Sequence, residues 1–210
     1  MGKIFYILGK SSTGKDTIYK NVLNREGLSL NNVVLYTTRP IRDGEIADKT
    51  YHFVDEEKYR ELEEKGMIIE ARAYNTMHGL WRYFTVNDTE LDLNNKDYLI
   101  IGVLQSYISI RDYFGEDKVV PIYIEVDDAV RLQRALDREK QPENRKFTEM
   151  CRRFLADTED FAEEKLIEAG ITRRFVNDDL DRCTAEICDY IGGIVNGYKG
   201  KSTESGKCSD

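Results

Sequence analysis

Short apolar runs alternate with amphipathic stretches along most of this chain. The runs at 4–8, 98–104 and 119–126 are rich in β-branched and aromatic residues, which indicates buried β-strands. Between these runs, apolar residues recur every three or four positions, which is the spacing of an amphipathic helix. Apolar strands that alternate with helices pack as a parallel sheet covered on both faces, so the pattern predicts an α/β fold.

Several predicted helices have recognisable ends. Gly66 closes an acidic helix that begins at 55, and Gly115 closes a helix that begins at 106. Asp127 is a suitable N-cap for a helix over 128–139. Further helices are predicted at 16–23, 150–169 and 180–194, and further strands at 33–36, 50–54, 67–74, 80–86 and 173–177.

Two segments depart from this rhythm. The stretch 35–96 is richer in aromatic residues and in strands that alternate with polar positions, which predicts an inserted lobe. After 196 the residues are mainly Gly, Lys, Ser and Glu, so we expect a disordered tail over 196–210.

Composition narrows the function classes. The chain has 210 residues and a formal net charge of −8, which argues against a general binder of nucleic acid or of anionic membranes. No apolar run approaches the roughly 20 residues of a membrane span, and the start of the chain lacks the features of a signal peptide. Two histidines are too few for a histidine-rich metal site. The four cysteines lack zinc-type spacing and predict free thiols in a reducing compartment, hence a cytoplasmic protein; we expect Cys151 to be buried.

A glycine-rich stretch follows the first strand. Residues 9–16 read G-K-S-S-T-G-K-D and match the phosphate-loop pattern G-x-x-x-x-G-K-[ST] except at its last position. In such a loop, backbone N–H groups and the positive end of the next helix hold phosphates, and Lys15 can bridge the β- and γ-phosphates. The alternative is a flexible turn with an exposed lysine. The predicted ATP-binding residues of the loop are Gly9, Lys10, Ser11, Ser12, Thr13, Gly14, Lys15, Asp16 and Thr17.

The last loop position bears on the metal ion. Mg²⁺ prefers oxygen ligands in octahedral geometry, and a Ser or Thr hydroxyl normally supplies one of them here. This chain has Asp16 followed by Thr17. Either Asp16, directly or through a water, or Thr17 is expected to serve Mg²⁺.

A second anion site is predicted in the stretch YTTRPIRDGE. Arg39 and Arg42 lie three residues apart beside a proline, in a turn that follows a strand. Two guanidinium groups on one side of a turn can clamp one phosphate, and Tyr51 can add a hydroxyl. The alternative is a pair of solvated surface arginines.

Taken together, these motifs resemble the guanylate kinase family of P-loop nucleoside monophosphate kinases. The stretch T-T-R-x-x-R-x-G-E followed by Y-x-F-V resembles the family's monophosphate-binding signature, and GMIIEARAY contains a carboxylate, Glu70, at the position that reads guanine. The segment RALDREKQPENRKFTEMCRRF resembles the arginine-bearing lid, and FVNDDLD resembles the loop beside the donor adenine. The resemblance covers nearly all of the chain except the tail.

The resemblance implies a role for each matching residue. It implies that Thr38, Arg39, Arg42, Tyr51, Glu70, Tyr83 and Thr85 bind GMP. It implies that Asn177 contacts adenine, and that Arg138 and Arg153 join Lys15, Arg39 and Arg42 in catalysis. Arg152 competes with Arg153, because adjacent residues on a helix cannot both face the site.

The resemblance also implies an organisation. It implies a core over 1–34, 97–137 and 156–195, a mixed α/β GMP-binding lobe over 35–96 and a short helical lid over 138–155, all within one domain over 1–195. ATP and GMP are the implied substrates, with Mg²⁺ as cofactor, no nucleic-acid or membrane partner, and a monomeric or homodimeric state.

Some positions depart from the family. Leu35 and Val103 stand where the family has a serine and an aspartate that contact the base, and Trp81 and His78 have no assignable counterpart. Guanine recognition then rests on Glu70 and Thr85. Two alternatives remain open: a kinase for another nucleotide or phosphorylated acceptor, and a phosphopeptide-binding module without catalysis.

Overall fold

A five-stranded parallel sheet forms the core of the molecule. The computed structural model describes residues 1–42, 44–76, 79–87, 91–141 and 146–204. All neighbouring strands of the sheet pair in parallel, as the alternation of strands and helices predicts. In spatial order the strands are β2 (Leu30–Asn32), β7 (Asp97–Gly102), β1 (Ile4–Leu8), β8 (Val119–Glu125) and β9 (Arg174–Val176). The predicted α/β fold class is therefore confirmed.

Helices cover both faces of this sheet. On β1, Phe5 and Ile7 pack toward one face and Tyr6 and Leu8 toward the other, because side chains alternate along a strand. The first face is covered by α1 (Lys15–Leu23) and α7 (Leu180–Glu204), and the second by α3 (Leu104–Phe114) and α6 (Glu163–Glu168). The central strand is thus buried on both sides, which fixes the position of the loop that follows it.

A second, four-stranded sheet lies within 35–96, the range of the predicted lobe. Its strand order is β4 (His52–Phe53), β3 (Tyr36–Thr37), β6 (Gly79–Val86) and β5 (Ile68–Thr76). One face packs on α2 (Glu56–Glu64) through Tyr59, Leu62, Phe84 and Val86. Residues that alternate with Phe84 and Val86 therefore occupy the opposite face.

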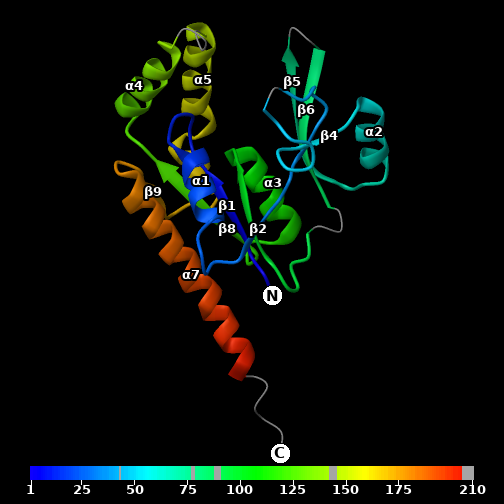
Figure 1. The fold of residues 1–210 in the computed structure, drawn as a ribbon, viewed down its shortest axis with the longest axis vertical. Helices are drawn as coiled ribbons and strands as arrows, with labels where there is room; N and C mark the ends of the chain where they lie inside the picture. The colour runs from blue at the N-terminus through cyan, green and yellow to red at the C-terminus, as the bar shows by residue number, and fades with distance from the viewer. Residues whose placement is uncertain (43, 77–78, 88–90, 142–145, 205–210) are drawn as a thin grey trace, which may run out of the picture.

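A pair of helices forms an arm beside the first sheet. They are α4 (Asp128–Glu139) and α5 (Phe147–Asp160), and residues 142–145 between them lie outside the described residues. Asp127 caps α4 by accepting from the N–H groups of Ala129 and Val130, as predicted. The arm and the small sheet lie at the same end of the core, on either side of it (Figure 1).

Three sequence predictions differ from the structure. The helix predicted at 150–169 is two helices, since Phe161 leaves helical geometry and stacks its buried ring on Tyr123 at 5.9 Å. The strand predicted at 33–36 is replaced by β2 and β3 on either side of 33–35. Cys151 is exposed rather than buried.

The tail also differs from its prediction. The last helix, α7, continues to Glu204, so disorder is wrong for 196–204, while 205–210 lie outside the described residues. Buried Ile187, Ile191 and Val195 anchor the helix on the core, and extending an existing helix costs less than starting one. No helix in the described ranges has the length and apolar character needed to cross a membrane.

Candidate functional site

The glycine-rich loop joins β1 to α1 at the carboxyl end of the central strand. Ser12 and Gly14 have left-handed φ values of 63° and 83°, and Gly14 begins α1 without a side-chain cap. A Cβ on Gly14 would lie 2.6 Å from Nδ2 of Asn177, and one on Gly9 would lie 2.6 Å from the carbonyl oxygen of Ile124. The close approach requires both glycines, and the uncapped N–H groups of α1 suit an anion.

Other loop side chains mainly serve the loop itself. Lys10 forms an ion pair with Asp128 at 3.3 Å, and the Thr13 hydroxyl donates to the carbonyl of Lys10 at 2.9 Å. Oγ of Ser12 is buried and has no hydrogen-bond partner among the described residues. At the start of α1, Asp16 and Thr17 are exposed, a placement that suits ligands of a metal bound together with phosphate.

Asn177 lies behind the loop. Its Nδ2 donates to the carbonyl oxygen of Thr13 at 2.7 Å, and the side chain is buried. Arg134 in turn donates to the backbone carbonyl of Asn177 at 3.2 Å. The observed contacts of Asn177 are thus with the loop and the arm, and its contact with adenine stays a prediction.

Cationic side chains converge on the loop. Burial lowers the pKa of Lys15; the carboxylates of Asp16 and Asp157 oppose this shift, and the nearby guanidinium groups of Arg153 and Arg131 reinforce it. Arg138, Arg153 and Arg131 from the arm line one small hollow together with Ser11 and Ser12 of the loop. A concentration of positive charge beside free N–H groups is suited to a polyphosphate.

The adjacent arginines of α5 face in different directions. Arg152 forms a forked pair with Glu149, with two N–O distances of 2.7 Å, and its side chain is exposed. Arg153 lines the hollow beside Ser11 and Ser12 instead. Of the two candidates, the structure therefore brings Arg153 to the loop.

Two residues of the arm were missed by sequence reasoning. Arg131 is 1% exposed, donates to the carbonyl of Ser11 at 2.9 Å and pairs with Asp128. Asp157 accepts from the backbone N–H of Ser11 at 2.8 Å and from Arg131 at 3.3 Å. The spacing of Asp128 and Arg131 was visible in the sequence, but on a helix it is equally typical of a surface ion pair.

On the small sheet, Arg39 is already engaged. Its guanidinium forms a forked pair with Glu45 at 2.7 and 2.5 Å, and its Nε donates to the Tyr83 hydroxyl at 3.0 Å. Arg42 is exposed, with its guanidinium 5.7 Å from the Trp81 ring. The two arginines were expected to clamp one phosphate together, but in this structure the fork of Arg39 is occupied by a carboxylate of its own turn.

The pair of Arg39 and Glu45 makes stability depend on pH. The hydrogen bonds from Arg39 lower the pKa of Glu45 from 4.5 to about 2. Because the folded-state pKa is lowered, the stabilisation is present above the ordinary pKa and is lost as the pH falls through 4.5 toward 2. We expect the difference in urea unfolding free energy between wild type and Glu45→Gln to shrink between about pH 6 and about pH 3. The exposed Glu57→Gln is the control, and a difference that is constant with pH would contradict the assignment.

Glu70 is the centre of a buried polar cluster. It is 8% exposed; its Oε1 accepts from the Thr85 hydroxyl at 2.9 Å and its Oε2 from the Ser106 hydroxyl at 3.0 Å. Ser106 is on α3, so the cluster joins the small sheet to the core. Arg72 lies beside it, with Nε 3.3 Å from Oε2 of Glu70. Ser106 and Arg72 were not predicted, because nothing in the sequence marks them as neighbours of a carboxylate on another element.

Strand β6 connects the two groups on the small sheet. Tyr83 and Thr85 alternate on one face; Tyr83 contacts Arg39 and Thr85 contacts Glu70. The Tyr51 ring packs edge-on against Tyr83 at 5.7 Å. The Thr38 hydroxyl accepts from the backbone N–H of Arg82, so Thr38 positions the turn. The Glu70 carboxylate and the Arg39 guanidinium thus both contact the same face of β6. This arrangement suits the base and the phosphate of one mononucleotide.

Comparison with known proteins finds a matching family. The family model described as "Guanylate kinase" matches residues 1–192. The chain belongs to the guanylate kinase family. Guanylate kinase of Nitrobacter winogradskyi is 29% identical over 89% of this chain and 80% of its own length.

Further relatives extend the comparison. Guanylate kinase of Syntrophomonas wolfei is 32% identical over 58% of this chain and 61% of its own length. The crystal structure of guanylate kinase from Anaplasma phagocytophilum has a TM-score of 0.63 and 19% identity, and the match covers 90% of this chain and 84% of that one. At that identity the structural likeness supports the shared fold alone.

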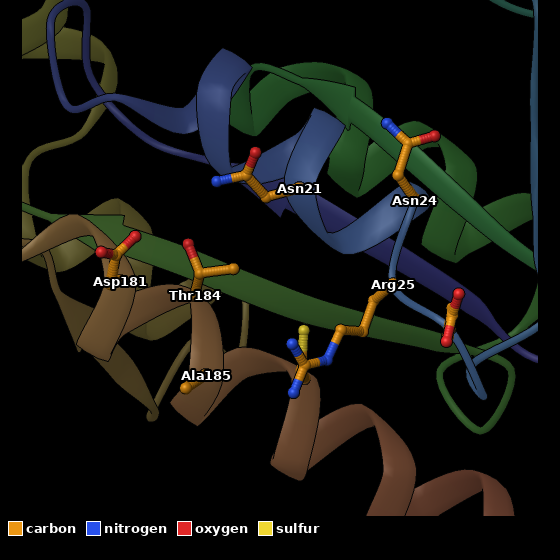
Figure 2. A pocket seen from close by; sticks show the side chains of 8 residues that line it. Asn21, Asn24, Arg25, Asp181, Thr184 and Ala185 are labelled. Atoms are coloured by element: carbon orange, nitrogen blue, oxygen red, sulfur yellow. The ribbon is translucent and has the colours of Figure 1, made fainter.

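A separate groove lies between α1 and α7 (Figure 2). It is lined by Asn21, Asn24, Arg25, Glu26, Asp181, Thr184, Ala185 and Cys188. Of these residues, Asp181 alone belongs to the guanylate kinase motifs identified in the sequence, as the last residue of FVNDDLD. The side chain of Arg25 extends toward α7, where it lowers the pKa of Cys188 against the stronger, opposite effect of burial.

His78 lies outside the described residues. Within the described ranges, no group of three or more His, Cys, Asp or Glu side chains is arranged to hold a metal ion.

Proposed function

We propose that this chain transfers the γ-phosphate of ATP to GMP, which gives ADP and GDP. The family model that the chain matches is described as guanylate kinase, the enzyme that phosphorylates GMP with ATP. The observation that carries the proposal is the buried Glu70 carboxylate, which two hydroxyls hold in place. A carboxylate has about four acceptor positions, so two remain for the N1–H and 2-amino groups of guanine.

The donor side is built from the loop and the arm. Backbone N–H groups of the loop and Lys15 hold the β- and γ-phosphates. Arg138 and Arg153 neutralise charge on the transferring group, in line with the hollow that they share with Ser11 and Ser12. Asn177 acts from behind the loop as a positioning residue.

The acceptor side is built on the small sheet. The guanidinium of Arg39 has five N–H donors. Four of them donate to Tyr83, to Pro40 and to the two oxygens of Glu45, so one N–H is left for a phosphate in this arrangement. Arg42 supplies the second guanidinium, and the hydroxyls of Tyr51 and Tyr83 complete the contacts with the GMP phosphate. This division keeps the predicted residues but assigns the larger share of the phosphate to Arg42.

Mg²⁺ fits the start of α1. Asp16 and Thr17 would hold it through one or two oxygen ligands, with the remaining positions filled by phosphate oxygens and water. When bound, the ion neutralises charge that develops on the phosphate oxygens. The departure at Asp16 keeps an oxygen ligand at the position where the loop pattern has a hydroxyl.

Transfer of a phosphoryl group needs alignment more than covalent chemistry. The GMP phosphate attacks the γ-phosphate in line, while the cations of both sides neutralise the equatorial oxygens. The arm and the small sheet lie on either side of the core, which suits closure over both nucleotides and exclusion of water (Figure 1). We place the reaction in the cytoplasm, which the free thiols of Cys151, Cys183 and Cys188 support, and propose a monomer or homodimer without nucleic-acid or membrane partners.

Glu70→Gln tests the acceptor assignment. The wild type should use GMP best in a coupled assay with GMP, dGMP, AMP, UMP and CMP. In the variant we expect kcat/KM for GMP to fall about 10- to 100-fold, because the amide offers one acceptor instead of two, while the KM for ATP stays within about twofold.

Glu57→Gln, an exposed change on α2, serves as control. Best turnover on another acceptor would favour the alternative of a different nucleotide kinase. ATP binding by calorimetry without turnover on any acceptor would favour a binding module.

A further inference from the structure

Arg72 is a partly buried cation on the same sheet face as Glu70. The two residues are alternate positions of β5, paired in register with Tyr83 and Thr85 of β6. The Arg72 side chain is 19% exposed, with Nε 3.3 Å from Oε2 of Glu70. Arg72 therefore lies where the acceptor base meets Glu70 in the proposed function, on which this inference rests.

Nε of Arg72 contacts Oε2 of Glu70 at 3.3 Å as an ion pair, without the geometry of a hydrogen bond. This buried Nε has no hydrogen-bond partner among the described residues. Two buried arginines behave differently: Arg39 bonds Glu45, Pro40 and Tyr83, and Arg131 bonds Asp128, Asp157 and Ser11. Buried polar groups are nearly always hydrogen-bonded, so a guanidinium nitrogen that has only an ion-pair contact, beside the carboxylate proposed to read the base, points to a ligand acceptor.

Two positions at which the family has base-contacting polar residues carry no donor in this chain. Leu35 directly precedes β3, and Val103 lies three residues before Ser106; both side chains are apolar. The Thr85 and Ser106 hydroxyls already donate to Glu70. Tyr6 is fully buried and hydrogen-bonds to Ser106, and burial raises its pKa. Within this cluster, Arg72 is the group with donors left to give to a base.

We propose that Arg72 is a specificity-determining residue that donates to O6 of a 6-oxopurine while Glu70 accepts from N1–H. Guanine and hypoxanthine both present an acceptor at position 6 beside a donor at N1. Adenine presents the reverse, an amino donor at position 6 and an acceptor at N1. The adjacent guanidinium and carboxylate match the first edge and oppose the second at both atoms. Arginine is well suited to the O6 and N7 acceptors of a purine.

The competing explanation is that Arg72 only positions Glu70. The nucleotides GMP and IMP separate the two roles, because they differ in the 2-amino group and share O6. Loss of a contact with O6 lowers kcat/KM for GMP and for IMP by the same factor. Loss of Glu70 geometry reduces the use of GMP more, because the carboxylate reads the 2-amino group.

The test compares wild type, Arg72→Met, Arg72→Lys and Glu70→Gln on GMP, IMP and AMP. For Arg72→Met we expect kcat/KM to fall about 10- to 100-fold for GMP and IMP alike, with AMP changed less and the KM for ATP within about twofold. Arg72→Lys keeps the charge beside Glu70 and loses the planar fork, so it should give an intermediate loss with the same GMP-to-IMP ratio.

Arg82→Met is the matched control for folding. Arg82 lies on the other face of the same sheet, where it pairs with Glu56 at 3.1 Å and packs on Tyr59, so this change should leave the nucleotide preferences unaltered. The proposal would be overturned if the ratio of kcat/KM for GMP to kcat/KM for IMP fell in Arg72→Met as it does in Glu70→Gln. Equal losses of kcat/KM for GMP and AMP would also overturn it. Calorimetry of GMP and IMP binding gives the same comparison without turnover. A wild type that binds these nucleotides but phosphorylates none would overturn the kinase function and leave Arg72 testable.

Discussion

Replacement of Lys15 by methionine should lower kcat about 10³-fold, the largest effect expected from any single change in this chain. Lys15 is the first residue of α1, next to the glycine-rich loop, and burial lowers its pKa, an effect that a bound anion would oppose. Methionine preserves the length of the side chain and removes the charge that stabilises the transferring phosphoryl group. Steady-state assays with ATP and GMP measure kcat, and calorimetry measures ATP affinity separately.

Lys20→Met is the control for this experiment. Lys20 is exposed on the same helix and belongs to neither nucleotide site, so its replacement should leave kcat within about twofold. If Lys15→Met retained most of the wild-type kcat, the loop would not serve catalysis. Suppose that wild type and Lys15→Met bind ATP with equal affinity but the variant loses turnover. Lys15 would then act by stabilising the transition state rather than by binding ATP.

The parts of the site that the sequence revealed are local in the chain. The loop at 9–16 could be recognised because a strand, two glycines, a lysine and a helix follow one another directly. The hydrophobic pattern also located the strands of the core, since β1, β7 and β8 are buried on both faces and read as continuous apolar runs. Such features depend on neighbours a few residues apart.

The parts that the sequence did not reveal depend on distant neighbours. The bond from Ser11 to Asp157 joins residues 146 positions apart, and that from Ser106 to Glu70 joins residues 36 apart. No local pattern distinguishes Asp157 from other acidic residues of its helix. Arg72 was not predicted for the same reason. Its place beside Glu70 is set by the register of β5 against β6 and by the position of α3.

The arginine turn illustrates an intermediate case. The motif correctly indicated a special turn, and Arg39, Tyr51 and Tyr83 do lie together. It could not show which acceptor the fork of Arg39 would take. Glu45 lies six residues after Arg39 in the same turn, and its carboxylate pairs with the Arg39 guanidinium, so the turn completes its own ion pair. A guanidinium fixed in this way is preorganised, and Arg42 remains the adaptable partner.

Arg153→Ala and Arg152→Ala should differ sharply in activity although the residues are adjacent. We expect Arg153→Ala to lower kcat about 10²- to 10³-fold, because Arg153 reaches the loop near Lys15, where it can neutralise charge on the transferring group. Arg152→Ala removes an exposed pair with Glu149 and should leave kcat within about twofold. Thermal unfolding of both variants checks that α5 is intact.

The comparison decides which face of α5 serves the reaction. A loss in Arg152→Ala as large as that in Arg153→Ala would mean that the helix turns by about 100° about its axis when the arm closes, since adjacent residues on an α-helix are separated by that angle. A loss confined to Arg153→Ala, with the KM for ATP little changed, would mean that the arm closes with the helix facing as it does here. The arginine would then act on the transferring group rather than on the binding of ATP, because a contact made only in the transition state lowers kcat without raising KM.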